Sequence, residues 1–432
     1  MQADRTREAL GQLREQAQRL LAGNRKRGFD PRYRRHYSYV CPAPREYPWQ
    51  WFWDSCFHAI ILTHLDVEQA KEELATLVAT QEHDGFIGHV VFWDGAAQRH
   101  LWRRYWNWLE SRLALAPRHS ALIQPPVLAQ AVEAVYRRSG DAAFLREMLP
   151  RLVRYYRWLA EHRDPDGDGL IAIISNNESG MDHLPAYDEV LGLNGAGRPT
   201  RWQVGRKTRG LDLSNLVLGR NYHLPRIFAL DRFNVEDVAV NCVYAEGLHT
   251  LAGLAREGGL PAVAEECARR ARRVEEALVA KCYDAEMGAF FSLCRRQERK
   301  ARVLTVASLF PLILGGVPRQ YLDTLVARHL LSPDAFWVPY PVPSVARGER
   351  SFDPEPSQRS RPVLWRGPTW INTNWFLVRG LRRHGYRDVA EAIAERSVAL
   401  VAREGFREFY HPFTGRGMGA RDFAWSALVL DM

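Results

Sequence analysis

Residues 369–403, TWINTNWFLVRGLRRHGYRDVAEAIAERSVALVAR, contain the pattern that decides the fold. Apolar residues recur every three to four positions on both sides of HGYRD (384–388), which predicts two helices joined by a tight turn. Such a short connector favours an antiparallel helical hairpin. The connector SGDAA (139–143) separates two further helical segments in the same way.

Helical periodicity extends over most of the remaining sequence, and no convincing run of alternating strand residues is present. We predict about a dozen helices, at residues 4–22, 52–64, 67–80, 119–138, 141–162, 235–257, 260–282, 304–313, 317–330, 369–384, 387–403 and 421–431. A dozen helices paired as hairpins can close into a ring of six pairs. We therefore predict an all-α fold, an (α/α)6 barrel in the form of a six-hairpin toroid. No repeat of fixed period is visible, which disfavours an open solenoid.

Long irregular segments alternate with the short connectors, and a ring of hairpins would gather them on one face. They cover residues 23–51, 81–101, 163–234, 284–300, 331–368 and 404–420. Long loops in a compact domain are usually functional, and many of the 14 tryptophans fall within them. We predict one catalytic domain over residues 1–432, with loop insertions near 23–51, 163–234 and 331–368 and a site on the loop face.

The composition is that of an ordinary globular chain, with 46% hydrophobic and 25% charged residues. No stretch of about 18 apolar residues is present to span a membrane, and the N-terminal segment lacks the apolar core of a secretory signal. We therefore expect a cytoplasmic protein. The six cysteines show no metal-binding spacing, and we expect free thiols. The sequence is compatible with a homo-oligomer but does not specify the oligomeric state.

The formal charge is 59 − 50 = +9, and only five of the cations are lysines. The basic residues are spread along the chain as helix-surface pairs, which disfavours a nucleic-acid-binding surface. A basic cleft would suit a small anionic substrate, although net charge alone is weak evidence for one.

The segment PWQWFWDSCFHAI (48–60) places Asp54 between an aromatic cluster and the start of an apolar helix. Asp54 would either cap that helix or bind sugar hydroxyls while an indole stacks on the sugar ring, and the sequence leaves both interpretations open. In HSALIQPPVLAQAV (119–132), the two prolines fit a helix start with Gln124 just outside it. Gln124 carries little information by itself.

The longest irregular segment contains ISNNESGMDHLPAYD (174–188), with Glu178, Asp182 and Asp188. Several acidic residues close together in a loop without regular structure indicate a function, and proton transfer during catalysis is one such function. Glu178 and Asp182 are the better candidates, and composition does not choose between them.

The preceding stretch RDPDGDGL (163–170) imitates the start of a calcium loop. Pro165 follows the first acid, and Ser175 stands at the twelfth position in place of a glutamate, which disfavours calcium. We expect no metal and no cofactor.

Two further aromatic segments lie near the C-terminus. In LWRGPTWINTNWF (364–376), Trp370 would either pack against neighbours or line a wet surface with Asn372. In GFREFYHPFTGRGMGARDFAWSALVL (405–430), aromatic neighbours would partly desolvate Glu408 and raise its pKa. Two carboxylates far apart in sequence, each in an aromatic loop on one face, meet the minimum need of glycosidic bond cleavage.

These motifs together resemble glycoside hydrolase family sixty-three. The resemblance rests on WFWDSCFHAI, QPP, ESGMD, WRGPTWINTNW and the pattern FxEFYxPxTGxGxG, in this order, and extends from about residue 48 to 430. It implies an (α/α)6 barrel of inverting, exo-acting α-glycosidases, with Asp182 as general acid and Glu408 as general base. It also implies that the subsite for the cleaved sugar is lined by Trp53, Asp54, Gln124, Gly180 and Trp370.

The compact chain is similar, within this family, to the bacterial mannosylglycerate and glucosylglycerate hydrolases. The resemblance therefore implies hydrolysis of α-mannosylglycerate, α-glucosylglycerate or both, and a site for the glycerate carboxylate, which favours a bidentate arginine. We expect Arg220 and Tyr222, in LGRNYHLPR (218–226), to form that site.

Two alternatives remain open at this point. The first is an α-glucosidase or trehalase-like hydrolase of neutral gluco-oligosaccharides on the same fold. The second is a sugar-binding barrel without catalytic activity. A terpene cyclase or prenyltransferase is disfavoured, because the sequence has no DDxxD motif and no suitable Cys/His set.

Overall fold

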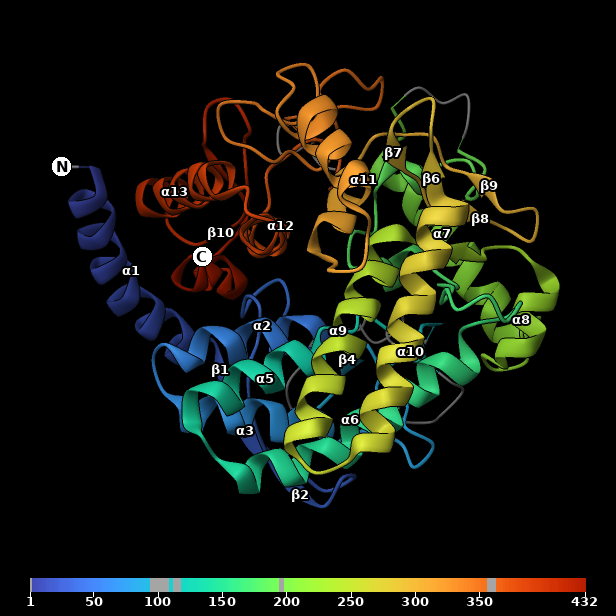
Figure 1. The fold of residues 1–432 in the computed structure, drawn as a ribbon. Coiled ribbons are helices and arrows are strands. Elements are labelled where there is room, and N and C mark those ends of the chain that lie inside the picture. The colour runs from blue at the N-terminus through green and yellow to red at the C-terminus, as the bar shows by residue number, and fades with distance from the viewer. Residues whose placement is uncertain (1, 94–108, 112–117, 194–197, 356–362) are drawn as a thin grey trace.

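A computed structural model of the protein describes residues 2–93, 109–111, 118–193, 198–355 and 363–432 (Figure 1). Within these ranges most of the chain is helical, and the strands are short. All six cysteines are buried free thiols, as predicted. No helix among the described residues is both long enough and apolar enough to cross a membrane.

Six helical elements of the described chain form a closed inner ring. Each contacts the next, so that α2 meets α5, α5 meets α9, α9 meets η4, η4 meets α12, α12 meets η7, and η7 returns to α2. These elements are α2 (Phe52–Thr63), α5 (Leu128–Ser139), α9 (Val238–Glu257), η4 (Val306–Ile313), α12 (Ile371–Arg383) and η7 (Ala424–Asp431). Every residue of α2 and η4 is buried, as expected for helices that are enclosed on all sides.

An outer layer of helices covers this ring, and each outer helix packs on an inner element. The outer helices are α1 (Gln2–Asn24), α3 (Val67–Val78), α6 (Ala142–His162), α10 (Pro261–Ala277) with its continuation η3 (Leu278–Cys282), α11 (Arg319–Thr324) with its continuation η5 (Leu325–Leu330), and α13 (Arg387–Glu404). The N-terminal α1 lies beside α13 and the C-terminal η7, which closes the toroid (Figure 1). The predicted (α/α)6 barrel is confirmed.

The predicted hairpin turns have local signals that end one helix and start the next. Gly140 adopts a left-handed conformation after α5, and Asp141 then caps α6 by accepting hydrogen bonds from the backbone of Ala143 and Phe144. Asp66 caps α3 in the same way after the short turn that follows α2. The inner helices are therefore joined to outer helices by short turns, and the long segments lead back from the outer layer to the ring.

Several predicted helix boundaries were wrong. The helix predicted at 119–138 begins only at Leu128, because the prolines at 125 and 126 keep the preceding segment extended. The segment 163–234, predicted as irregular, contains the helices α7 (Arg201–Val217) and α8 (Leu224–Leu230). It also contains the single 3₁₀ turns η1 (Asn176–Ser179) and η2 (Pro185–Tyr187). The inner elements η4 and η7 are 3₁₀ helices.

Short antiparallel strand pairs also form within the long segments, although no strand was predicted. They are β1 (Arg25–Asp30) with β2 (Arg35–Val40), β3 (Gln50–Trp51) with β4 (Val90–Val91), β5 (Val235–Glu236) with β8 (Leu293–Cys294) and β9 (Arg299–Lys300), β6 (Tyr283–Asp284) with β7 (Ala289–Phe290), and β10 (Arg407–Tyr410) with β11 (Gly417–Arg421). In the last pair, Arg407 stands opposite Arg421.

Candidate active site

A small cavity lies where the N-terminal ends of four inner elements meet. Trp53 is in the first turn of α2, Gln124 precedes α5, Trp370 is the residue immediately before α12, and Trp425 is in the first turn of η7. The cavity has a volume of about 90 Å³ and is lined by Pro42, Tyr47, Trp51, Trp53, Asp54, Gln124, Gly180, Asp182, Leu364, Trp365, Trp370, Glu408, Phe423 and Trp425. These residues come from segments that span most of the chain.

Seven of the ten residues predicted for the site line this cavity: Trp53, Asp54, Gln124, Gly180, Asp182, Trp370 and Glu408. Asn372, the second residue of α12, is fully buried and is not part of the lining. Its amide has no hydrogen-bond partner among the described residues. Its role in binding stays a prediction.

The structure does not bring Arg220 and Tyr222 to the cavity. The hydroxyl of Tyr222 donates a 2.7 Å hydrogen bond to the carbonyl of Leu109, and its ring packs in a separate buried cluster with Leu216 and Phe228. Arg220 is exposed at the surface between α7 and α8. A tight turn with left-handed backbone at both residues directs them away from the pocket.

Glu408 has a hydrogen bond to each of its carboxylate oxygens. The Tyr47 hydroxyl donates to Oε1 over 2.9 Å, and the backbone N–H of Ala420 on the neighbouring strand β11 donates to Oε2 over 2.9 Å. Burial raises the pKa of Glu408, while these two hydrogen bonds and the charge of Arg201 act in the opposite direction. The carboxylate form of Glu408 is thus directly supported by two donors.

Asp182 lies between the turns η1 and η2, where Asn176 holds the loop by donating a 2.8 Å hydrogen bond to the Asp182 carbonyl. Burial raises the pKa of Asp182 to about 7. A backbone N–H and the charge of Arg201 lower the pKa, and the negative charge of Glu408 raises it. The protonated form of Asp182 is therefore well populated near neutral pH.

The two carboxyl groups thus differ in the way an acid and a base must differ. Both are buried in one aromatic cavity, but Glu408 has paired donors that favour the anion and Asp182 keeps its proton up to about pH 7. Burial raises the pKa of both groups, and it is their unequal hydrogen-bonding surroundings that suit one to act as an acid and the other as a base.

Asp54 supplies a third buried carboxyl group to the cavity. Its Oδ1 atom has no hydrogen-bond partner among the described residues, and burial raises its pKa well above the ordinary value. Gln124 is held close by, because its side-chain oxygen accepts a 3.0 Å hydrogen bond from the backbone N–H of Trp53. Polar groups of this kind can bind hydroxyl groups of a ligand.

Aromatic rings form the walls of the cavity. Trp365 stacks on Trp370 with ring centroids 3.7 Å apart and an angle of 4° between the planes. Trp365 has a φ of 58°, a left-handed conformation that is costly for a bulky residue and that is often found at functional sites. Trp425 meets Trp370 and Trp53 at steep angles. Such rings offer apolar faces to a sugar.

Gly180 allows the loop of Asp182 to approach the ring of Trp53. Its φ of 67° is left-handed, and a Cβ atom at this position would lie 2.6 Å from the Trp53 ring. A glycine is therefore required here both by the backbone and by the close contact.

Glu178, the other candidate from the same motif, does not line the cavity. Its two oxygens pair with the guanidinium group of Arg163 over 2.6 and 2.8 Å, and both side chains are fully buried. Glu178 also accepts hydrogen bonds from the backbone N–H groups of Ile123 and Ile174. It therefore ties the Asp182 loop to the segment that carries Gln124.

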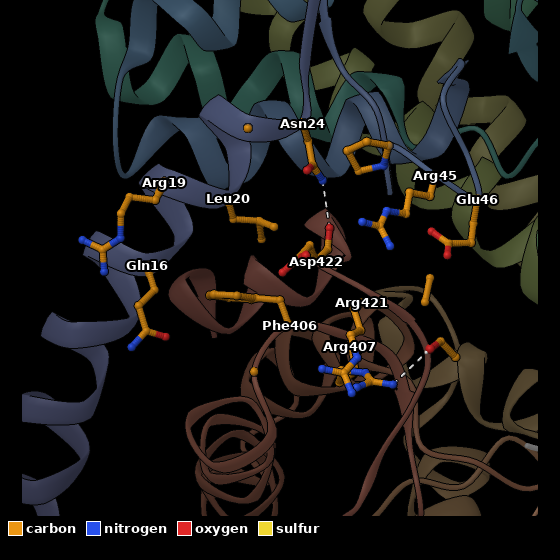
Figure 2. A pocket seen from close by; sticks show the side chains of 15 residues that line it. Gln16, Arg19, Leu20, Asn24, Arg45, Glu46, Phe406, Arg407, Arg421 and Asp422 are labelled. Atoms are coloured by element: carbon orange, nitrogen blue, oxygen red, sulfur yellow. Dashed lines mark hydrogen bonds between the residues drawn. The ribbon is translucent and has the colours of Figure 1, made fainter. Parts of the chain in front are cut away.

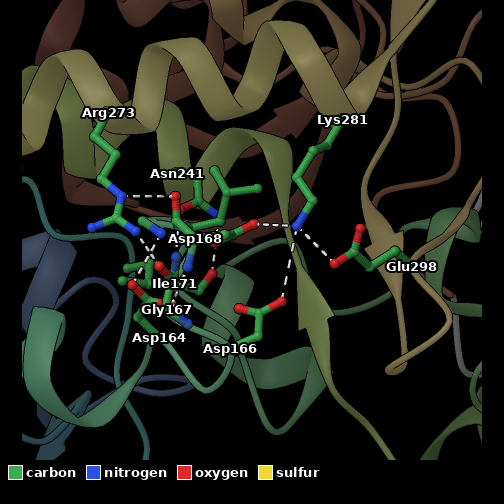
Figure 3. A network of polar contacts seen from close by, with 11 residues as sticks. Asp164, Asp166, Gly167, Asp168, Ile171, Asn241, Arg273, Lys281 and Glu298 are labelled. Atoms are coloured by element: carbon green, nitrogen blue, oxygen red, sulfur yellow. Dashed lines mark hydrogen bonds and ion pairs between the residues drawn. The ribbon is translucent and has the colours of Figure 1, made fainter.

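The stretch resembling a calcium loop forms a polar network near η3 (Figure 3). Carboxylates of Asp166, Asp168, Glu236 and Glu298 lie close together, and the ammonium group of Lys281 contacts Asp168 and, over 2.7 Å, Glu298. Burial alone would lower the pKa of Lys281, but these carboxylates raise it above its ordinary value. The lysine supplies the positive charge within the network.

Sequence reasoning missed Tyr47, Trp51, Phe423 and Trp425 as lining residues, and Arg201 as the cation that acts on both Asp182 and Glu408. Trp51 and Trp425 do lie within the quoted aromatic segments, so their proximity to Asp54 and Glu408 was an available signal. Tyr47 lies immediately before the first of these segments, and Arg201 had no comparable signal among the many arginines.

Comparisons with known proteins find a matching family, related sequences and a related structure. Residues 47–426 match the family described as the mannosylglycerate hydrolase MGH1-like glycoside hydrolase domain. The chain is 33% identical over 420 residues to the mannosylglycerate hydrolase of Thermus thermophilus, covering 91% of this chain and 95% of that protein. It is 29% identical over 424 residues to the glucosylglycerate hydrolase of Mycolicibacterium hassiacum, covering 90% and 92%. The crystal structure of the family sixty-three mannosylglycerate hydrolase from Thermus thermophilus in complex with Tris superposes with a TM-score of 0.82, at 32% identity and over 97% of this chain and 99% of that one.

Proposed function

The chain belongs to the mannosylglycerate hydrolase MGH1-like glycoside hydrolases of family sixty-three, and we propose that it hydrolyses α-mannosylglycerate, α-glucosylglycerate or both to the free hexose and glycerate. This proposal is supported by one relative named as a mannosylglycerate hydrolase and one named as a glucosylglycerate hydrolase, each of which aligns with about nine-tenths of the chain. The substrate is thus a small sugar derivative with one negative charge.

In the proposed reaction, Asp182 protonates the oxygen of the leaving glycerate while Glu408 removes a proton from the attacking water. Water attacks the anomeric carbon from the opposite side, so the configuration inverts. The observation that carries this proposal is the unequal setting of the two buried carboxyl groups. Asp182 has a pKa of about 7, whereas Glu408 accepts hydrogen bonds from Tyr47 and Ala420.

We place the hexose between the aromatic walls, with Asp54 and Gln124 toward its hydroxyl groups. The buried Oδ1 of Asp54 without a partner supports this assignment, because an unpaired buried acceptor is costly unless a ligand satisfies it. Indole faces of Trp365 and Trp370 would cover the apolar side of the ring.

We place the glycerate carboxylate toward Arg201 and not toward Arg220. Arg201 is the arginine whose charge acts on both Asp182 and Glu408, and an arginine binds a carboxylate through two parallel hydrogen bonds. Both arginines are exposed and lie outside the cavity lining, so the assignment rests on the effect of the Arg201 charge on the two carboxyl groups.

The test is proton NMR of the purified protein with α-mannosylglycerate, α-glucosylglycerate and the neutral disaccharide trehalose, with the Asp182→Asn variant as control. We expect the β-anomer of the free hexose to appear first from a glycerate-linked substrate and not from the control. First appearance of the α-anomer would contradict the inverting mechanism. Faster turnover of trehalose would contradict the substrate class.

A further inference from the structure

A second and much larger cavity lies between α1 and the β10–β11 hairpin, outside the pocket that holds Asp182 (Figure 2). Its volume is about 980 Å³. The lining includes four arginines and two carboxylates, which gives a net charge of 4 − 2 = +2: Arg19, Arg45, Arg407 and Arg421, against Glu46 and Asp422.

The hairpin forms a wall between this cavity and the active site. Successive side chains of a strand point to opposite faces, so Arg407 lines the large cavity while Glu408 lines the small pocket. In the same way, Glu46 lines the large cavity and the next residue, Tyr47, lines the small pocket. The large cavity is therefore distinct from the site of the proposed hydrolysis, and its occupant does not depend on that function.

Arg407 and Arg421 form a pair of like charges across this hairpin. They stand directly opposite one another in the register of β10 and β11, and Figure 2 shows their guanidinium groups next to each other. Like charges at directly opposite positions destabilise a strand pair. No carboxylate of the described chain forms an ion pair with either guanidinium group.

Arg407 also has unsatisfied hydrogen-bonding capacity. Its Nε atom is buried and has no partner among the described residues, and its Nη2 donates to a neutral acceptor, the Gly419 carbonyl, over 3.1 Å. Burial and the charge of Arg421 lower the pKa of Arg407, while the nearby charges of Glu404 and Asp422 act in the opposite direction. A partly buried cation of this kind is stabilised when an anion binds to it.

We propose that the cavity is a binding site for the phosphate group of a small molecule, held between Arg407 and Arg421. Arginine forks match the oxygens of phosphate through paired hydrogen bonds. A phosphate monoester carries about 1.5 to 2 negative charges near pH 7. Its charge therefore matches two arginines better than the single negative charge of a carboxylate ligand would. The cavity has the size of small-molecule sites, which run to about 1,000 Å³, so the organic part of such a ligand also fits.

The test is isothermal titration calorimetry of the full chain with inorganic phosphate as the probe, with chloride at equal ionic strength as reference. We expect saturable binding of one phosphate per chain. The double variant Arg407→Gln/Arg421→Gln should bind at least tenfold more weakly. Arg269→Gln, which removes an exposed arginine of α10 outside the cavity, should bind like the wild type. Absence of saturable binding, or equal binding by the double variant, would overturn the proposal.

A second measurement covers the case in which the double variant does not fold. Without phosphate, Arg421→Gln should melt at the same temperature as the wild type or above it, because the substitution removes a like-charge contact. With phosphate, it should show a smaller rise in melting temperature than the wild type. A lower melting temperature without phosphate, together with an unchanged rise, would assign Arg421 a purely structural role and overturn the proposal.

Discussion

The hydroxyl of Tyr47 donates a 2.9 Å hydrogen bond to Oε1 of Glu408, a residue 361 positions later in the chain. The Ala420 N–H holds the other oxygen. The orientation of the proposed base therefore depends on the segment that leads into α2 and on the strand next to its own.

Replacing Tyr47 by phenylalanine removes one of these two donors and keeps the ring. Hydrogen bonds to charged groups contribute about 1.5–3 kcal/mol, so we expect kcat to fall about 10- to 100-fold. The pKa of Glu408 should rise, because the hydrogen bond stabilises its carboxylate, and the acidic limb of the kcat profile should move to higher pH. Tyr321→Phe, on the outer helix α11, serves as the matched control and should leave the profile unchanged. A normal acidic limb in Tyr47→Phe would show that this contact does not tune the base.

The roles of Asp182 and Glu408 can be separated by the leaving group. For glycerate-linked substrates, we expect Asp182→Asn and Glu408→Gln each to lower kcat by about 10²- to 10⁴-fold. A glycosyl fluoride needs little protonation of its leaving group, so Asp182→Asn should hydrolyse it much better than the glycerate substrate. Glu408→Gln should remain slow on both, because activation of water is lost. Equal losses of both variants on both substrates would contradict the assignment.

The pH dependence of kcat/KM should be bell-shaped. A general acid must carry its proton, so activity should fall as the pH rises through the pKa of Asp182, about 7. A general base must be ionised, so activity should also fall as the pH drops through the raised pKa of Glu408. Initial rates between pH 4 and 9 measure both limbs, and the residual activity of Asp182→Asn should lack the alkaline limb. Persistence of that limb in the variant would assign it to another group.

Arg201→Gln should act on both binding and acidity. The charge of Arg201 lowers the pKa of Asp182, so its removal should move the alkaline limb to higher pH. Loss of the partner for the glycerate carboxylate should raise KM for glycerate-linked substrates about tenfold or more, with little effect on a glycosyl fluoride. Arg220→Gln, an exposed arginine outside the cavity, is the matched control. A larger KM effect in Arg220→Gln than in Arg201→Gln would restore the original assignment.

Gly180→Ala tests the close contact between the Asp182 loop and Trp53. Gly140 is also left-handed, with a φ of 65°, but a Cβ atom there would meet nothing within 4 Å. Both alanine variants should lose about 1–2 kcal/mol of unfolding free energy from backbone strain. Gly180→Ala should lose a further 1–3 kcal/mol or so from the contact with the ring, and should also lose kcat. Denaturant unfolding of the two variants measures the difference, and equal losses would show that the loop accommodates the methyl group.

The ring of helices was predictable because its signals are local. Apolar periodicity, a left-handed glycine such as Gly140 and a capping acid such as Asp141 act within a few residues, and they define hairpins without reference to the remainder of the chain. The helix α7 was not predicted, because its local sequence pattern does not reflect its burial. Its buried face includes Thr208, Asp212 and Asn215, so burial there does not follow the apolar pattern.

The candidate site was predictable where motifs carry its residues, and seven predicted residues do line one cavity. Arg220 and Tyr222 do not line this cavity, because a tight turn places Arg220 at the surface and Tyr222 in a separate cluster. Among 59 basic residues, sequence alone offered no means of telling Arg201 from Arg220.

By itself, the sequence determined the helical hairpins, the (α/α)6 barrel and the aromatic segments that carry Asp182 and Glu408, because these depend on contacts between near neighbours in the chain. Only the tertiary structure decided that Glu178 pairs with Arg163, that Tyr47 holds Glu408, and that Arg407 faces Arg421 on a cavity of its own. Those features depend on burial and on charged groups that are far apart in the sequence and close together in the fold. The spacing of neighbouring residues predicts neither the desolvation that raises a pKa nor the partner that lowers it again.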